Sequence, residues 1–148
     1  MSEAVLRELA QVLEEQVGVY QELLEIAIKK EDILRLADVE ALEQVVKVEQ
    51  GLILQGGELE KRRFTLQQAL AAARGVPVED MTLEKLAQGA EDPTVALCLN
   101  TGEKLAHIIK ELEERNERCA RVINEALSLV KRTVENTAGR KNLVDRLV

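Results

Sequence analysis

Aromatic residues are almost missing from the sequence: Tyr20 and Phe64 are the only two, and tryptophan is absent. The core must therefore be built from Leu, Val, Ile and Ala, which suits helices that interdigitate along their lengths. The same scarcity argues against an aromatic-lined cofactor pocket and against stacking on nucleic-acid bases. Hydrophobic residues still make up 46% of the 148 residues, which is enough for the core of one domain.

Histidine, a common catalytic and metal-binding residue, is also scarce. His107 is the only histidine, and the heptad register places it opposite the apolar seam, where we expect a solvated side chain. Glu103 and Glu111 lie one turn away, but a di-metal centre in a helical bundle needs several inward-pointing carboxylates and two histidines. No GK[ST] phosphate loop is present. We therefore expect no enzyme activity, no cofactor and no metal.

Two cysteines, Cys98 and Cys119, are too few for a disulfide scaffold. If both belong to one helix, a rise of about 31 Å separates them, which is far beyond bridging distance. We expect two small, buried, apolar side chains in a reduced, cytoplasmic setting. The N-terminus, MSEAVLRELAQ, is acidic and amphipathic, unlike a secretory signal.

Long hydrophobic runs are missing as well, since no stretch approaches the roughly 20 apolar residues that span a bilayer. The chain has 27 acidic and 20 basic residues and a formal charge of −7. Phosphate backbones and anionic membrane surfaces repel such a chain. We therefore expect neither nucleic acid nor membrane lipid as a partner.

Helical periodicity, by contrast, is nearly continuous, and strand alternation is missing, which predicts an all-α fold. We expect an elongated antiparallel helical bundle or coiled coil of three long helices plus one short helix. The predicted helices cover residues 3–36, 38–74, 82–88 and 93–136. Their predicted N-caps are Ser2, Asp38, Thr82 and Asp92.

The first predicted helix carries two apolar rows side by side. The first row is Leu6, Leu9, Leu13, Gln16, Tyr20, Leu23 and Ala27. The second row repeats every seven residues: Val5, Val12, Val19, Ile26 and Ile33. Two adjacent rows make a face wide enough to contact two other helices.

Gly56 and Gly57 fall in the middle of the second predicted helix, where each glycine costs about 1 kcal/mol relative to alanine. A kink or a break is one interpretation. The apolar phase continues from Leu52 to Leu59, which favours one continuous helix.

An amide and a thiol interrupt the heptad seam of the last predicted helix. The seam is Val95, Cys98, Gly102, Leu105, Ile109, Leu112, Asn116, Cys119, Ile123, Ala126 and Val130. Leucine would be more stabilising at the positions of Asn116 and Cys119. Either Asn116 fixes the register within the bundle, or this part of the seam faces a partner protein. Periodicity alone leaves both interpretations open.

The last helix also looks too long for its neighbours, since the three long helices would span about 52, 55 and 66 Å. Gly139 is expected to interrupt it, which leaves residues 138–148 as a tail with four aliphatic side chains. Burying four such side chains gains about 6–12 kcal/mol. Ordering about ten residues costs about 15 kcal/mol, so we expect the tail to be flexible unless a partner adds contacts.

Several segments resemble the FlgN family of flagellar export chaperones over nearly the whole chain. They are LRELAQVLEEQVGVYQELLEIAIKKEDIL, ADVEALEQVVKVEQGLI, LEKRR, TLEKLAQ and ELEERNERCARVINEALSLV. Their order and spacing carry the resemblance, because leucine-rich helices match one another easily. The family usually has a second asparagine three residues after the one that matches Asn116, whereas this chain has Cys119. It also usually has an unbroken helix around the position of Gly56 and Gly57.

The resemblance implies a cytoplasmic chaperone that binds the terminal amphipathic helix of hook-associated proteins, the hook–filament junction clients, and keeps them export-competent for the flagellar type III apparatus. It implies a helical bundle of residues 1–137 and a client-binding tail of residues 138–148. The partner-binding residues that it implies are Asn116, Cys119, Ile123, Leu127, Val130, Val134, Leu143, Val144 and Leu147. Contact with the flagellar export apparatus and formation of a homodimer stay open. The alternative is a structural coiled-coil module that pairs only with copies of itself.

Overall fold

The computed structural model describes residues 2–87 and 92–147, which contain helices and connectors but no strand. A short 3-10 helix, which the sequence did not predict, lies between the second and third α-helices. The elements in chain order are α1 (Ser2–Arg35), α2 (Val39–Arg74), η1 (Val78–Asp80), α3 (Leu83–Ala87) and α4 (Pro93–Leu147). Three long helices and one short helix confirm the predicted fold class.

Side chains cap α2 and α4 where the sequence predicts them, whereas Ser2, the predicted cap of the first helix, is itself the first residue of α1. At the start of α2, the Ala41 N–H donates a hydrogen bond to Asp38 Oδ1 at 3.1 Å. At the start of α4, the Thr94 N–H donates one to Asp92 Oδ1 at 2.9 Å. Gly75 ends α2 with a left-handed φ of 68°, a conformation that glycine adopts without strain. These local signals explain why the predicted ranges of α1 and α2 agree with the structure to within one residue.

The helix α1 contacts both other long helices, α2 and α4. One core cluster joins Leu9 of α1 to Leu70 of α2 and Leu105 of α4. A second cluster joins Val19 of α1 to Leu59 of α2. The prediction that the two rows of α1 touch two helices is therefore confirmed.

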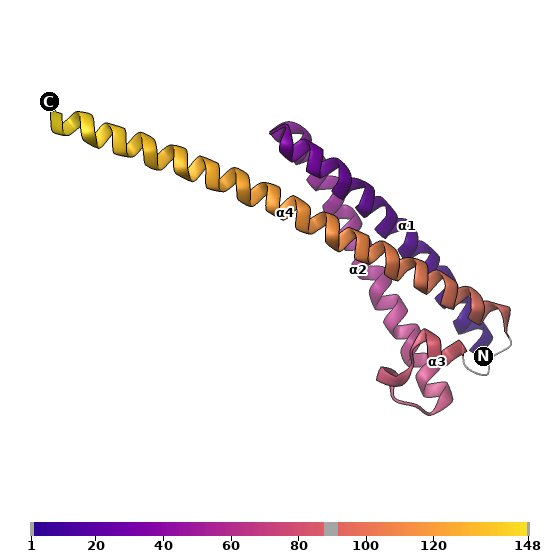
Figure 1. Ribbon diagram of the computed structural model, residues 1–148. Helices are drawn as coiled ribbons and strands as arrows, with labels where there is room; N and C mark the ends of the chain where they lie inside the picture. The colour runs from indigo at the N-terminus through magenta and orange to yellow at the C-terminus, as the bar shows by residue number, and fades with distance from the viewer. Residues whose placement is uncertain (1, 88–91, 148) are drawn as a thin grey trace.

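Hydrogen bonds from the two thiols of α4 show how α4 lies against α1. Cys98 Sγ donates to the Leu6 carbonyl oxygen at 3.8 Å, and Cys119 Sγ donates to the Ala27 carbonyl oxygen at 3.5 Å. Both pairs are 92 residues apart in sequence, so α1 and α4 run parallel and stay in register over three heptads. The helix α2 returns between them in sequence and runs antiparallel to both (Figure 1).

The helix α2 is continuous through both mid-helix glycines, which confirms the favoured interpretation. Gly56 is buried against α1, and a Cβ at that position would lie 3.7 Å from Val19 Cγ1. A methyl group at Gly56 would make only an ordinary van der Waals contact with α1, so the packing does not require glycine there, and Gly57 has open space around it.

The end of α4 corrects the sequence prediction. The sequence predicts an end near Asn136 and an interruption at Gly139, whereas α4 continues through both residues to Leu147. A single exposed glycine costs a helix only about 1 kcal/mol relative to alanine. No proline follows Gly139 to stop the helix. The helix α4 therefore has 55 residues and is about 82 Å long.

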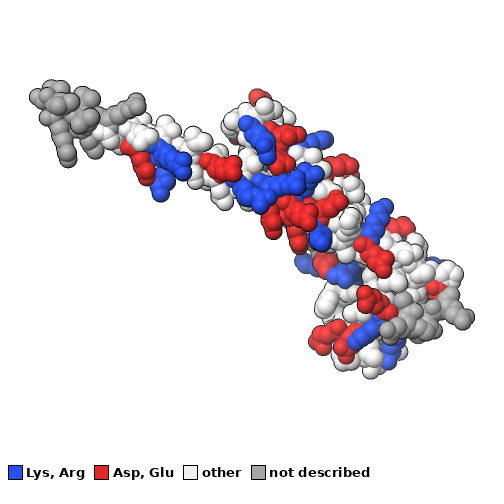
Figure 2. Space-filling view, in the orientation of Figure 1, with Lys and Arg blue, Asp and Glu red and all other residues white. Residues whose placement is uncertain are grey.

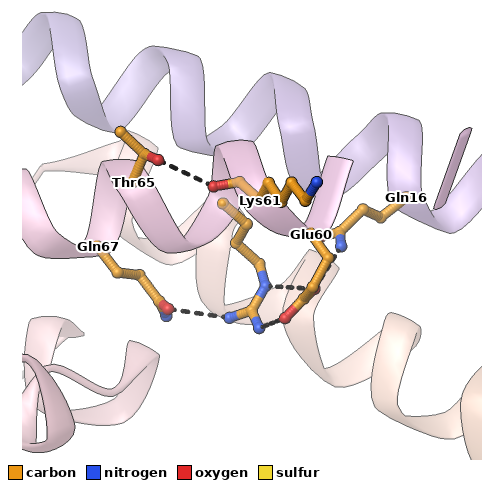
Figure 3. A network of polar contacts seen from close by, with 6 residues as sticks. Gln16, Glu60, Lys61, Thr65 and Gln67 are labelled. Carbon is orange, nitrogen blue, oxygen red and sulfur yellow. Dashed lines mark hydrogen bonds and ion pairs between the residues drawn. The ribbon is translucent and has the colours of Figure 1, made fainter. Parts of the chain in front are cut away.

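A polar network crosses the contact between α1 and α2 (Figure 3). Gln16 is only 1% exposed, and its Nε2 donates to Glu60 Oε2 at 2.9 Å. Arg63 donates to Glu60 and to Gln67 Oε1. The hydrogen bonds from Arg63 hold the pKa of Glu60 below its usual 4.5, although partial burial opposes the shift. This pairing therefore stabilises the fold above about pH 4.5, and its contribution is lost as the pH falls through the lower folded-state pKa.

The side-chain carbonyl oxygen of Gln16, Oε1, leads to a testable prediction. Gln16 Oε1 is buried and has no hydrogen-bond partner among the described residues. Because an unpaired buried carbonyl is costly, Gln16→Leu should raise the free energy of unfolding by about 1 kcal/mol in urea denaturation. Gln11→Leu, at an exposed position of the same helix, is the matched control and should change stability by less than about 0.5 kcal/mol. Loss of stability in Gln16→Leu would contradict this prediction and mean that the lost hydrogen bond from Gln16 Nε2 to Glu60 outweighs the cost of the unpaired Oε1.

Candidate functional site

Beyond Cys119, the helix α4 leaves the rest of the molecule (Figure 1). Cys119 is 4% exposed, and no residue from Ala120 to Gly139 is buried. The helix α1 ends at Arg35, which the 92-residue register would place opposite Leu127. The last 20 residues of α4 therefore lie past the end of α1 and extend about 30 Å beyond it.

Ion pairs between charged side chains mark the end of the hydrophobic core, at the level where α4 leaves the bundle. Lys30 Nζ pairs with Glu49 at 3.1 Å, and both side chains are largely buried. Arg115 pairs with Glu31 at 3.6 Å. The aliphatic seam between α1 and α4 ends at these ion pairs, so the aliphatic residues that follow on α4 have no counterpart on α1.

Aliphatic residues nevertheless continue at heptad-like spacing on the projecting part of α4. Ile123, Leu127, Val130 and Val134 follow at intervals of four, three and four residues, which places them on one side of the helix. They are 38%, 61%, 60% and 62% exposed, respectively. We call these four residues the free face of α4. A contiguous exposed aliphatic surface of this kind marks a site of interaction with another apolar surface.

The other partner-binding residues that the family resemblance implied lie in different environments in the structure. Asn116 is exposed, so it does not act as a buried, register-setting amide. Cys119 is buried against the Ala27 carbonyl, so it is not part of the free face. The backbone of Leu143, Val144 and Leu147 belongs to α4, but their side chains lie outside the described residues.

Leu129 is an exposed residue that the sequence prediction missed. It is 65% exposed and lies on the projecting part of α4, about 100° around the helix from Val130 and therefore outside the free face. The heptad positions of the seam do not include it. The available signal was a second row, since Val122 and Leu129 are seven residues apart and directly precede Ile123 and Val130 in sequence.

Burial also sets the chemistry of the two thiols. Burial raises the pKa of the Cys119 thiol, and the nearby positive charge of Lys30 opposes the shift. Burial likewise raises the pKa of the Cys98 thiol, and the carboxylate of Asp92 adds to the effect. Both side chains are buried and neutral at pH 7, and they pack as small apolar residues, as the sequence predicts.

Thiol reactivity tests this packing directly. At pH 7, Cys98 and Cys119 should react with a maleimide at less than about 1% of their rate in denaturant, because only exposed thiolates react quickly. The matched control is Ser128→Cys, since Ser128 is exposed on α4 nine residues beyond Cys119. If Cys119 reacts as fast as this introduced cysteine, α4 and α1 separate at the level of Ala27 and the described packing is wrong there.

Other candidate sites are weaker. His107 is exposed on α4, as predicted, and lies 3.4 Å from Glu111. A hollow of about 590 Å³ between α2, α3 and α4 is lined by Leu83, Leu99 and Glu103, among others. Within residues 2–87 and 92–147, no group of three potential metal ligands is close enough to hold an ion. In the same ranges, no helix has the length and apolar content that crossing a membrane requires.

Comparison with known proteins gives one match. The sequence profile of a family described as FlgN protein matches residues 1–143, a range that contains both the bundle and the free face of α4. Neither the curated proteins nor the solved structures contain a significant match to the chain.

Proposed function

Because the chain belongs to the FlgN family of flagellar export chaperones, we propose that it binds the terminal amphipathic helix of hook-associated proteins and keeps these clients export-competent in the cytoplasm. The observation that carries the proposal is the free face of α4. It consists of aliphatic side chains on a helix that continues past its own bundle. Binding and release of a client need no catalytic group in this scheme.

A helix is the partner that best suits the free face. Its four residues form a narrow stripe with a spacing of three and four residues, which is the pattern that a second helix packs against. Within the bundle, α1 packs in this way along the preceding heptads of α4. The client helix would extend the same mode of packing onto the part of α4 that α1 does not reach.

The free face alone supports a complex of limited strength. Burying four aliphatic side chains gains about 6–12 kcal/mol. Association costs about 4–15 kcal/mol in lost translational and rotational freedom. Further contacts are therefore needed, and we propose that residues 138–148 supply them through Leu143, Val144 and Leu147. Val144 lies two heptads after Val130 in sequence, so the same seam can continue into this segment.

Leu127→Gln tests the site. Gln is a good helix former, so the substitution removes apolar surface while keeping α4 helical. The affinity for a purified hook-associated client, measured by calorimetry, should fall by about 30-fold, since burial of one leucine contributes about 2 kcal/mol. The matched control is Leu54→Gln, because Leu54 is 72% exposed on α2, away from the free face. Equal affinities for the wild type and Leu127→Gln would refute this site.

Self-association is the competing role for the same surface. A coiled-coil module would cover Leu127 and Val130 with a second copy of the chain. Sedimentation velocity over a hundredfold range of concentration separates the two functions. We expect client binding at concentrations where the free chain is monomeric, whereas an obligate dimer that buries the free face would leave no site for a client.

Removal of residues 138–148 tests the contribution of the end of α4. The truncation should weaken client binding by about tenfold or more while leaving the melting temperature nearly unchanged. Stability should persist because, among the side chains that the structure describes up to Gly139, Cys119 is the last buried one, and the truncation begins 19 residues after it. Undiminished affinity in the truncated protein would exclude a role for this segment in client binding.

A further inference from the structure

The helix α2 carries aliphatic side chains outside its contact with α1. Val39, Val46 and Ile53 follow one another at intervals of seven residues, which places them on one side of the helix. This side is about 100–140° around α2 from Leu52, which packs in the core. Val39 is 65% exposed, Ile53 is 56% exposed and Val46 is partly exposed. We call these three residues the outer row of α2.

A hollow of about 320 Å³ between α1, α2 and α4 shows which helix the outer row faces. Glu60 is the next residue of the same heptad series, and it lines the hollow together with Gln16 of α1 and Ile109 of α4. This side of α2 therefore faces α4 at the level of the hollow. Because the core residues Leu59 and Leu52 keep the heptad spacing of the contact with α1, the outer row stays on the side of α2 that faces α4.

The free face lies on the corresponding side of α4. One heptad series runs from the hollow to the free face and consists of Ile109, Asn116, Ile123 and Val130. Ile109 is partly buried, whereas the three residues that follow it are exposed. Since Ile109 faces α2 across the hollow, the free face is on the side of α4 that faces α2.

Two contacts place the outer row and the start of the free face at similar levels along α1. Lys30 of α1 pairs with Glu49 of α2, and Cys119 of α4 contacts α1 about one turn earlier. Val46 and Ile123 lie about one turn beyond these contacts, on α2 and α4 respectively, in the direction of the α1–α2 turn. The main contacts of α2 and of α4 are both with α1. Two exposed aliphatic surfaces thus flank the end of α1.

We propose that the helix that binds to the free face of α4 also packs against the outer row of α2, and that its apolar face is therefore two heptad rows wide. This inference rests on the proposed function and specifies the class of helix that the site selects. The partner would take the fourth position beside α1, α2 and α4, as in a four-helix bundle. Within the chain, α1 packs in the same way, since its two adjacent rows contact α2 and α4. A helix with one narrow row would cover only one of the two surfaces.

Contact with the outer row adds binding energy that the free face alone lacks. The gain from burying the free face is comparable to the cost of association. Burying Ile53 and Val39, which are more than half exposed, adds apolar contact without a second loss of translational and rotational freedom. The end of the chain does not fill this position, because α4 continues to Leu147 and leads away from the α1–α2 turn (Figure 1).

Charged side chains of α4 lie mainly on its other side. Figure 2 shows side chains of both signs gathered on α4 where it leaves the other helices. Arg118, Arg121 and Glu125 line a separate hollow of about 270 Å³ beside α1. Helical spacing places these three residues about 140–160° around α4 from Ile123. The side of α4 that faces α2 is aliphatic, so the width of the apolar face of the partner, rather than its net charge, decides how well it fits.

Ile53→Gln tests the second surface in the full-length protein. Glutamine keeps α2 helical, and the affinity for a purified hook-associated client, measured by calorimetry, should fall by about tenfold because part of the isoleucine side chain would otherwise be buried. Leu54→Gln is the matched control, since Leu54 is 72% exposed and lies nearly opposite the contact with α1. The control should change the affinity by less than about twofold. Equal affinities for the wild type and Ile53→Gln would overturn the inference.

Photo-cross-linking shows whether one helix contacts both surfaces. The photoreactive amino acid p-benzoyl-phenylalanine replaces Ile53 in one variant, Leu127 in a second and Leu54 in a third. The first two variants should cross-link to the same helix of the client, as identified by mass spectrometry, and the third should not. Cross-links from the position of Leu127 alone would overturn the inference. Cross-links between two copies of the chain without client would also overturn it, in favour of self-association.

Comparison of two variants separates this inference from the proposed function. If Leu127→Gln weakens client binding but Ile53→Gln does not, the second surface is refuted and the proposed function stands. If Leu127→Gln has no effect, the proposed site fails, and the inference fails with it. If both variants weaken binding while Leu54→Gln does not, both conclusions hold.

Discussion

Leu6 faces Cys98 and Ala27 faces Cys119, and this constant separation of 92 residues keeps α1 and α4 parallel for three heptads. The projection of α4 past the bundle and the position of its free face depend on that contact. It fixes the direction of α4. The chain turns back after α1, at Asp38, whereas α4 continues past the bundle in the direction that it has beside α1. It also fixes which residues come after the turn, and those residues are aliphatic on one side of α4 and charged or polar on the opposite side.

Local signals in the sequence were sufficient for much of the fold. Short stretches of sequence contain the caps at Asp38 and Asp92, the helix stop at Gly75 and the two apolar rows of α1. The boundaries of α1 and α2 and the packing of α1 against two helices were therefore predictable. The end of α4 was not, because one glycine is a weak stop signal and nothing else follows it. The opposite environments of Asn116 and Cys119 were not predictable either, because the heptad pattern placed both residues on one seam and did not show which of them packs against α1.

The projecting part of α4 differs from the bundle in its energetics. A helix of about 20 residues without tertiary contacts is only marginally stable in water, so backbone hydrogen bonds there open far more easily than those in the core. Covering the free face would stabilise the helix and desolvate Ile123, Leu127, Val130 and Val134 at the same time. Partner binding and local helix stability are thus coupled, which suits a chaperone of this family that must hold a client and then release it.

Hydrogen–deuterium exchange of residues 120–139, measured in the free chain and with a saturating hook-associated client, shows whether the free face of α4 is uncovered until a partner binds. In the free chain, exchange of residues 120–139 should be close to that of an isolated helix at every protein concentration, while the core residues around Leu9 and Leu105 stay protected. Addition of the client should then protect residues 120–139. Strong protection of this segment in the free, monomeric chain, or no gain in protection with bound client, would contradict the claim that the free face of α4 awaits a partner helix.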